Sequence, residues 1–357
     1  MKIVARFEIP YFQYLDSAGA AVDKLPTFAS NTDELLELYR LMMLIRIFDN
    51  KAIALQRTGK LGTYPSTRGQ EAVFVGIGAG MEEKDLLVPY YRDIGSLIQR
   101  GVKLSEILLY WGGDERGNVF SGEDFPYSVP VGSQPLHAAG IATAFKIRKQ
   151  QRAVLVVCGD GATSEGDFYE AMNVAGAWQL PVVFVVCNNQ WAISVPREQQ
   201  TAAKTLAQKA IAAGFAGEEI DGNDVIAVKD RVEVAMKKAR ETNTPTLLEI
   251  ECYRHSDHTT ADDARRYEPE GLRDSHWNKE PITRLKNYLE NLKLWDNEKE
   301  TKLQEACTQE VEAAVADYLA IPPQAPETMF DYLYAELPDI YAAQRDDVMS
   351  KGEIPHG

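Results

Sequence analysis

Short apolar runs rich in β-branched residues recur through the middle of the chain, and stretches with helical spacing of apolar positions separate them. The clearest runs occupy residues 85–89, 153–158, 182–187 and 246–251. Helix-like sequence lies between the second and third runs, near 167–179, and before the last run, near 224–242. Such runs are typical of buried strands in a parallel sheet whose two faces are covered by helices. The pattern therefore predicts an α/β fold.

The two ends of the chain follow a different pattern. Residues 1–30 look irregular, with one short strand at most. A long helix is expected next, because Asn31 or Thr32 can cap its start and Gly59 can close it. From about residue 268 the sequence becomes helical and charged, and it is interrupted by the proline-rich joint Ile321-Pro322-Pro323.

This organisation suggests three segments. Residues 1–60 are expected to form an N-terminal arm and helix, residues 61–267 the α/β domain, and residues 268–357 a C-terminal helical extension.

Composition narrows the possible partners and the compartment. The net charge of −15 argues against nucleic acid or an anionic membrane as a partner, because both would repel an acidic surface. The four cysteines form no C-x-x-C pair, which argues against a zinc site or a redox dithiol and fits a reducing compartment. No signal peptide and no stretch of about 18 apolar residues is present. We therefore expect a cytoplasmic protein.

The most informative polar residues follow two neighbouring apolar runs. The run 153–158 ends at Gly159-Asp160-Gly161, and the run 182–187 ends at Asn188-Asn189. A right-handed crossover places two such strands parallel and close together. Asp160 and Asn189 should therefore emerge at the same carboxyl edge of the sheet, where open α/β sheets bind ligands.

These residue types fit a magnesium-bound diphosphate. A carboxylate, an amide oxygen and a nearby backbone carbonyl can hold three positions of an octahedral Mg²⁺, which takes phosphate oxygens for the remainder. Gly161 has no side chain, so its backbone N–H can approach a phosphate closely.

The string GDGATSEGDFYEAMNVAGAWQLPVVFVVCNNQWAIS resembles the alpha subunits of the thiamine-diphosphate-dependent 2-oxo acid dehydrogenase E1 component, of pyruvate or branched-chain type. The similarity extends over most of residues 35–345, including the closing stretch MFDYLYAELP. The resemblance implies the thiamine-diphosphate-binding fold. It also implies Asp160, Asn189 and the backbone carbonyl of Trp191 as Mg²⁺ ligands, although the family usually has tyrosine at the position of Trp191.

The same resemblance assigns further cofactor contacts. Gly161 and Ala162 would contact the diphosphate through their amides, and Tyr91 and Arg92 would match a cofactor-binding Tyr-Arg pair. A surface ion pair between Arg92 and Asp93 is the structural alternative. The loop after the last strand would supply Arg254 for the diphosphate and His258 as the catalytic residue, bound beside the cofactor and facing the substrate. Thr259 occupies the place of a phosphorylated serine in animal relatives, from which we infer no regulation.

Residues 128–134 (SVPVGSQ) resemble the segment that meets the thiamine ring. Val129 and Val131 would contact the cofactor, Val131 through its carbonyl. Some relatives bind K⁺ here, through the positions that correspond to Ser128, Pro130, Ser133 and Gln134. Tyr64 would line the substrate approach, unless it serves only in packing.

The resemblance implies oxidative decarboxylation of a 2-oxo acid, with acyl transfer to the lipoyl group of the E2 acyltransferase. It also implies an E1 beta subunit in an α₂β₂ heterotetramer, because no segment matches the carboxylate that activates the cofactor. Pyruvate is the favoured substrate, and branched-chain 2-oxo acids or acetoin are the alternatives. A metallohydrolase using His255, Asp257 and His258, or a non-catalytic scaffold, would be a different class of protein.

One further motif favours no additional function. Gly76-Ile77-Gly78-Ala79-Gly80 resembles a dinucleotide-binding turn, but Met81 replaces the third glycine and helical sequence precedes it. A nicotinamide site is therefore not expected.

Overall fold

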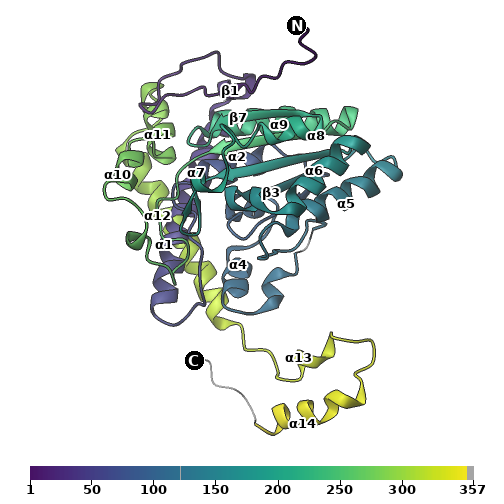
Figure 1. Ribbon diagram of the computed structural model, residues 1–357. Coiled ribbons are helices and arrows are strands. Elements are labelled where there is room, and N and C mark those ends of the chain that lie inside the picture. Colours follow the sequence, from purple (N-terminus) through teal and green to yellow (C-terminus); the bar gives the residue numbers. More distant parts are fainter. Residues whose placement is uncertain (121, 352–357) are drawn as a thin grey trace.

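A six-stranded parallel sheet forms the centre of the protein in the computed structural model, which describes residues 1–120 and 122–351 (Figure 1). The strand order is β1-β7-β8-β4-β3-β2, and every neighbouring pair is parallel. The strands are β1 (Tyr11–Phe12), β2 (Leu86–Val88), β3 (Val154–Gly159), β4 (Val182–Asn188), β7 (Ala216–Asp221) and β8 (Thr246–Glu251). A separate two-stranded hairpin joins β5 (Trp191–Ala192) and β6 (Val195–Pro196).

Helices account for most of the remaining chain. The longer ones are α1 (Thr32–Arg57), α2 (Glu71–Ala79), α4 (Leu104–Trp111), α5 (Ser133–Ile147), α6 (Gly166–Trp178), α9 (Val225–Thr242), α11 (Pro281–Asn291), α12 (Asn297–Ala320) and α14 (Ala342–Ser350). Shorter ones are α3 (Ile94–Gln99), α7 (Arg197–Gln200), α8 (Lys209–Ala213), α10 (Leu272–Trp277) and α13 (Thr328–Asp331).

Helices cover both faces of the sheet, as the apolar runs predict. Along β3, Val154 and Val156 belong to a core shared with α5, α6 and α8, whereas Leu155 and Val157 belong to a core shared with α1, α2 and α9. Side chains alternate between the two faces of a strand, so a run without polar residues must be buried on both sides. The predicted α/β fold class is confirmed.

Most predicted elements occur where the sequence places them, but β7 was missed. The side chain of Asn31 caps α1 by accepting from the backbone N–H groups of Asp33 and Glu34. The sequence of β7, AGEEID, contains too few apolar residues for a recognisable strand pattern. It forms a strand because β8 and β1 pair with it on either side.

The glycine-rich segment Gly76–Gly80 lies in α2 and at its end, which agrees with the rejection of a dinucleotide site. A Cβ at Gly76 would lie 2.5 Å from a methyl carbon of Val228, and a Cβ at Gly80 would lie 2.7 Å from one of Val232. These glycines therefore allow α2 and α9 to pack closely.

The larger of the two cores passes through all three proposed segments. It contains Leu44 of α1, Leu155 of β3 and Val311 of α12 among its buried residues. Beyond Ala320 the chain leaves this core, and α13 and α14 extend away from the body (Figure 1). Residues 352–357 of the proposed C-terminal extension lie outside the described residues. No helix in the described part is long and apolar enough to span a membrane.

Candidate active site

The ends of β3 and β4 bring the two motif residues together. These strands are parallel neighbours, and Gly159 pairs with Cys187 in their register. Asp160 and Asn189 therefore leave the sheet at the same carboxyl edge. Both line a cavity of about 250 Å³ together with other predicted residues: Tyr91, Arg92, Val131, Gly161, Ala162, Trp191 and His258.

Asp160 is a buried carboxylate that suits a cation. Its side chain accepts a hydrogen bond of 2.9 Å from Gln200 Nε2, and it forms no ion pair within the described residues. Burial raises its pKa to about 6, against the opposing effect of that hydrogen bond. A buried carboxylate without a positive partner is costly, and a bound metal ion removes that cost.

The second motif residue, Asn189, is held in place by Gln70. Asn189 Nδ2 donates to Gln70 Oε1 at 3.0 Å, and Asn189 Oδ1 accepts from the backbone N–H of Trp191 at 3.2 Å. Gln70 is fully buried at the start of α2. Because Gln70 occupies the amide nitrogen, the amide oxygen is the atom of Asn189 that remains for a metal ion. Trp191 is fixed through its indole N–H, which donates to Tyr253 Oη at 3.2 Å.

Gly161 lies where no side chain fits. A Cβ there would be 2.7 Å from the Cβ of Ala192, in the hairpin that follows Asn189. Gly161 and Ala162 belong to a 3-10 turn, Asp160–Ser164, directly after β3. Their backbone therefore borders the cavity closely, as a diphosphate contact requires.

Arg92 and His258 both line the cavity and contact each other there. Arg92 is almost fully buried and forms no ion pair with Asp93 in the described chain, so the surface-pair alternative is wrong. Arg92 Nη1 donates to Ser66 O at 2.7 Å, and Nη2 lies 2.9 Å from His258 Nδ1 and 2.5 Å from His258 O. Burial, then the charges of Arg92 and Arg254, lowers the pKa of His258 to about 3.

Arg254 is buried behind the cavity and does not line it. Its Nη2 donates to Ile193 O at 2.9 Å and to Tyr267 Oη at 2.6 Å, while Nη1 is buried and has no hydrogen-bond partner among the described residues. Burial, followed by repulsion from Arg92, lowers its pKa. Arg254 therefore contributes positive charge close to the cavity and has one unused donor.

The segment 128–134 is only partly at the cavity. Val131 and Gln134 line it, but Val129 does not. Ser128 Oγ lies 3.0 Å from Ser133 Oγ, Ser133 Oγ donates to Pro130 O at 2.8 Å, and Gln134 Nε2 donates to Ser128 O at 2.5 Å. The four residues named for K⁺ are thus adjacent, and K⁺ binding stays a prediction.

The His-Ser-Asp-His sequence does not form a metal cluster. His255 does not line the cavity, and its ring packs against Trp277 with ring centroids 4.8 Å apart. No group of three histidine, cysteine or acidic side chains in the described residues is placed to hold a metal ion. The metallohydrolase alternative therefore has no structural support.

Several residues near the cavity were not identified from the sequence. Glu165 and Ile193 line it, and Gln200 and Gln70 hold the two motif residues. Tyr64, expected near the substrate, is fully buried and donates to Asp49 Oδ1 at 3.1 Å, which is a packing role. Glu165 and Ile193 fall within the string that carries the family resemblance, whereas no pattern in the sequence singles out Gln70 or Gln200.

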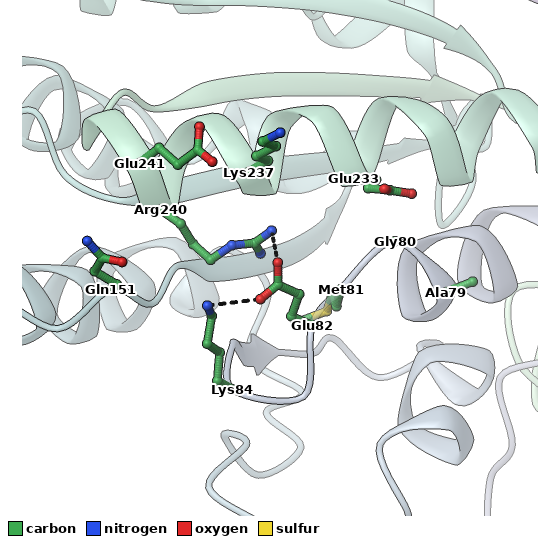
Figure 2. A pocket seen from close by; sticks show the side chains of 10 residues that line it. All are labelled: Ala79, Gly80, Met81, Glu82, Lys84, Gln151, Glu233, Lys237, Arg240 and Glu241. Atoms are coloured by element: carbon green, nitrogen blue, oxygen red, sulfur yellow. Dashed lines mark ion pairs between the residues drawn. The ribbon is translucent and has the colours of Figure 1, made fainter. Parts of the chain in front are cut away.

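A larger hollow of about 520 Å³ lies at the opposite edge of the sheet, beside the end of α9 (Figure 2). Three of its six charged side chains are acidic and three are basic, and three of the six are paired with each other. Glu82 contacts Lys84 at 3.0 Å and Arg240 at 2.6 Å (Figure 2). Arg240 also contacts Asp85. Since its charges are compensated, this hollow is not a candidate for the active site.

Comparisons with known proteins agree with the geometry. The dehydrogenase E1 component family matches residues 39–327. The chain is 37% identical to the pyruvate dehydrogenase E1 component subunit alpha of Bacillus cereus, over 96% of this chain and 92% of that protein. It is also 37% identical to the Bacillus subtilis (strain 168) protein of the same name, over 92% of this chain and 89% of that protein. The chain therefore belongs to the dehydrogenase E1 component family, which uses thiamine diphosphate, and it is an E1 alpha-like component of a 2-oxo acid dehydrogenase.

Proposed function

We propose that this chain is the alpha subunit of a pyruvate dehydrogenase E1 component and holds magnesium thiamine diphosphate at the carboxyl edge of its sheet. One observation carries the proposal: Asp160, Asn189, Arg92 and His258 line a single cavity at the ends of two neighbouring parallel strands. We take pyruvate as the substrate because the two relatives described above are pyruvate dehydrogenase subunits.

The proposal gives each of the candidate site residues a defined role. Asp160, Asn189 and the carbonyl of Trp191 bind Mg²⁺, while the amides of Gly161 and Ala162 contact the diphosphate. Tyr91 and Val131, which line the cavity, would border the cofactor. Arg92 and Arg254 offset the negative charge of the diphosphate, and the free Nη1 donor of Arg254 is available to it.

The cofactor supplies the electron sink for decarboxylation. His258 acts beside it as a neutral hydrogen-bond donor, because Arg92 occupies Nδ1 and leaves the proton on Nε2. A fixed donor at that position stabilises negative charge that develops on an oxygen during decarboxylation and acyl transfer.

The partners follow from the same proposal. We infer an E1 beta subunit in an α₂β₂ heterotetramer and a lipoylated E2 acyltransferase as acyl acceptor. Exposed apolar side chains around the cavity support a protein partner at its mouth: Val129, Val131, Leu136, Ile193 and Val195. We place the complex in the cytoplasm, where the four free buried cysteines stay reduced.

The test is 2-oxo acid-dependent reduction of an artificial electron acceptor by the chain co-expressed with its beta subunit. Pyruvate and 3-methyl-2-oxobutanoate are compared with and without Mg²⁺ and thiamine diphosphate. Turnover that requires the cofactor and prefers pyruvate supports the proposal. A preference for the branched substrate, or turnover of acetoin alone, would reassign the substrate, and no turnover by an assembled heterotetramer would indicate a non-catalytic role.

A further inference from the structure

The loop that carries His258 packs against a short segment without regular secondary structure, Tyr64–Arg68. Tyr64 O accepts from the backbone N–H of Thr260 at 2.9 Å, and Tyr64 N donates to Thr260 Oγ1 at 3.0 Å. At the other end of the loop, His255 N donates to Arg68 O at 3.1 Å. The segment thus holds the loop on both sides of His258.

Arg92 connects the centre of this segment to His258 itself. One terminal nitrogen donates to Ser66 O, and the other contacts both the carbonyl and the Nδ1 of His258. A shift of Ser66 would therefore displace the guanidinium and, with it, the imidazole ring.

The segment is in turn anchored by one buried carboxylate from α1. Asp49 is fully buried, and its oxygens accept from Ser66 Oγ at 2.5 Å, from Thr67 N at 2.8 Å and from Thr67 Oγ1 at 3.3 Å, besides the Tyr64 hydroxyl. No ion pair involves Asp49 among the described residues. The carboxylate is compensated only by these donors, so it can stay buried only while the segment keeps its position.

We propose that Asp49 is a positioning residue for His258: it fixes the Tyr64–Arg68 segment, and that segment, with Arg92, fixes the loop that presents the imidazole. The proposal rests on the catalytic role of His258 given above. Asp49 touches neither the cavity nor His258, so it acts only through the segment.

The test compares hydrogen exchange of the loop, residues 254–267, in wild type and Asp49→Asn, each as the full alpha chain co-purified with its beta subunit. The asparagine side chain has the size of the aspartate side chain but only one accepting oxygen instead of two. At least one donor from Ser66 or Thr67 therefore loses its acceptor. We expect the amides of the loop to exchange at least about 10-fold faster, because the Tyr64–Arg68 segment that holds the loop is less firmly fixed. Turnover should fall by about 10-fold or more through misplacement of His258, while the affinity for magnesium thiamine diphosphate stays within about 3-fold.

Asp224→Asn is the matched control. Asp224 is also a buried carboxylate that holds a distant segment, through the backbone N–H groups of Tyr14 and Leu15 at 2.7 Å. This variant should lose comparable stability yet leave exchange of the loop at the wild-type rate. Ser66→Ala and Thr67→Val, which each remove one bond to Asp49, should loosen the loop to a smaller degree and serve if Asp49→Asn does not fold.

Unchanged loop exchange in Asp49→Asn and Ser66→Ala overturns the proposal, and so does equal loosening in Asp224→Asn. The exchange measurement does not depend on turnover. Failure of the proposed enzymatic function would appear as an inactive wild type, whereas failure of this inference would appear as an active wild type whose loop is insensitive to Asp49.

Discussion

Arg92 Nη2 and His258 Nδ1 lie 2.9 Å apart, and this distance determines which nitrogen of the histidine carries the proton. A guanidinium can only donate, so Nδ1 must accept and the proton must lie on Nε2. Burial and the two neighbouring arginines, which lower the pKa of His258 to about 3, act in the same direction. The structure therefore contains a neutral imidazole with a defined donor.

This relationship predicts how turnover depends on pH. Because the pKa of His258 is about 3, the imidazole stays neutral and no inflection from it should appear between pH 5 and 8. His258→Ala should reduce acyl transfer to lipoyl groups by about 100-fold or more, the loss of a positioned donor. The measurements are the pH profile of turnover and, by calorimetry, the cofactor affinity of wild type and of His258→Ala. A wild-type inflection near pH 6.5 that disappears in His258→Ala would mean that the imidazolium is the active form.

Calorimetry also tests the proposed metal site. Asp160→Ala removes the only carboxylate among the three proposed Mg²⁺ ligands, and we expect the affinity for magnesium thiamine diphosphate to fall by at least about 100-fold. Asp167→Ala is the control, because it removes an exposed carboxylate from the first turn of α6, outside the cavity. An unchanged dissociation constant in Asp160→Ala would refute the ligand role.

The part of the site that could be predicted from sequence consists of residues that follow strands directly. Asp160 and Asn189 come immediately after apolar runs, and the parallel crossover rule is enough to bring them to one edge. The apolar runs themselves located β2, β3, β4 and β8. The apolar pattern failed for β7, where the adjacent residues Glu218 and Glu219 leave no apolar periodicity, because that strand depends on its pairing with β8.

The supporting residues could not be predicted because long-range packing brings them to the site. Gln70 meets Asn189 across 119 residues of sequence, and Ser66 meets Arg92 across 26. The packing of α1 and α2 against the sheet determines which residues they contact. A local sequence pattern cannot predict that packing. The same limit explains Tyr64, whose hydroxyl binds Asp49 although its position in sequence suggested the substrate approach.

The close packing of α2 on α9 gives a stability prediction with an internal contrast. Gly76→Ala places a methyl group 2.5 Å from Val228 Cγ1 and 3.1 Å from the backbone nitrogen of Lys229, and it should lower the free energy of unfolding by about 1–3 kcal/mol. Gly140 lies inside α5, and a Cβ there would meet no described atom within 4 Å apart from its chain neighbours and the backbone of its own helix. Gly140→Ala should therefore raise the free energy of unfolding by roughly 0.5–1 kcal/mol. Denaturant unfolding of the isolated chain measures both. A stabilising Gly76→Ala would mean that the two helices can move apart at little cost.

The buried carboxyl of Asp93 should make stability depend on pH. Burial raises its pKa to about 7, although Ser96 Oγ donates to Oδ1 at 2.5 Å. Oδ2 has no hydrogen-bond partner in the part of the chain that the structure describes. The unfolded chain loses this proton near pH 4, so between pH 4 and 7 only the folded state retains it. Its contribution to the free energy of unfolding is therefore complete below pH 4 and is lost as pH rises to 7, by roughly 1.4 kcal/mol per pH unit. Asp93→Asn cannot ionise, so between pH 5 and 7 wild type should lose roughly 2–3 kcal/mol relative to the variant in paired denaturant titrations. Equal pH dependence in both proteins would show that Asp93 is already ionised in the folded state.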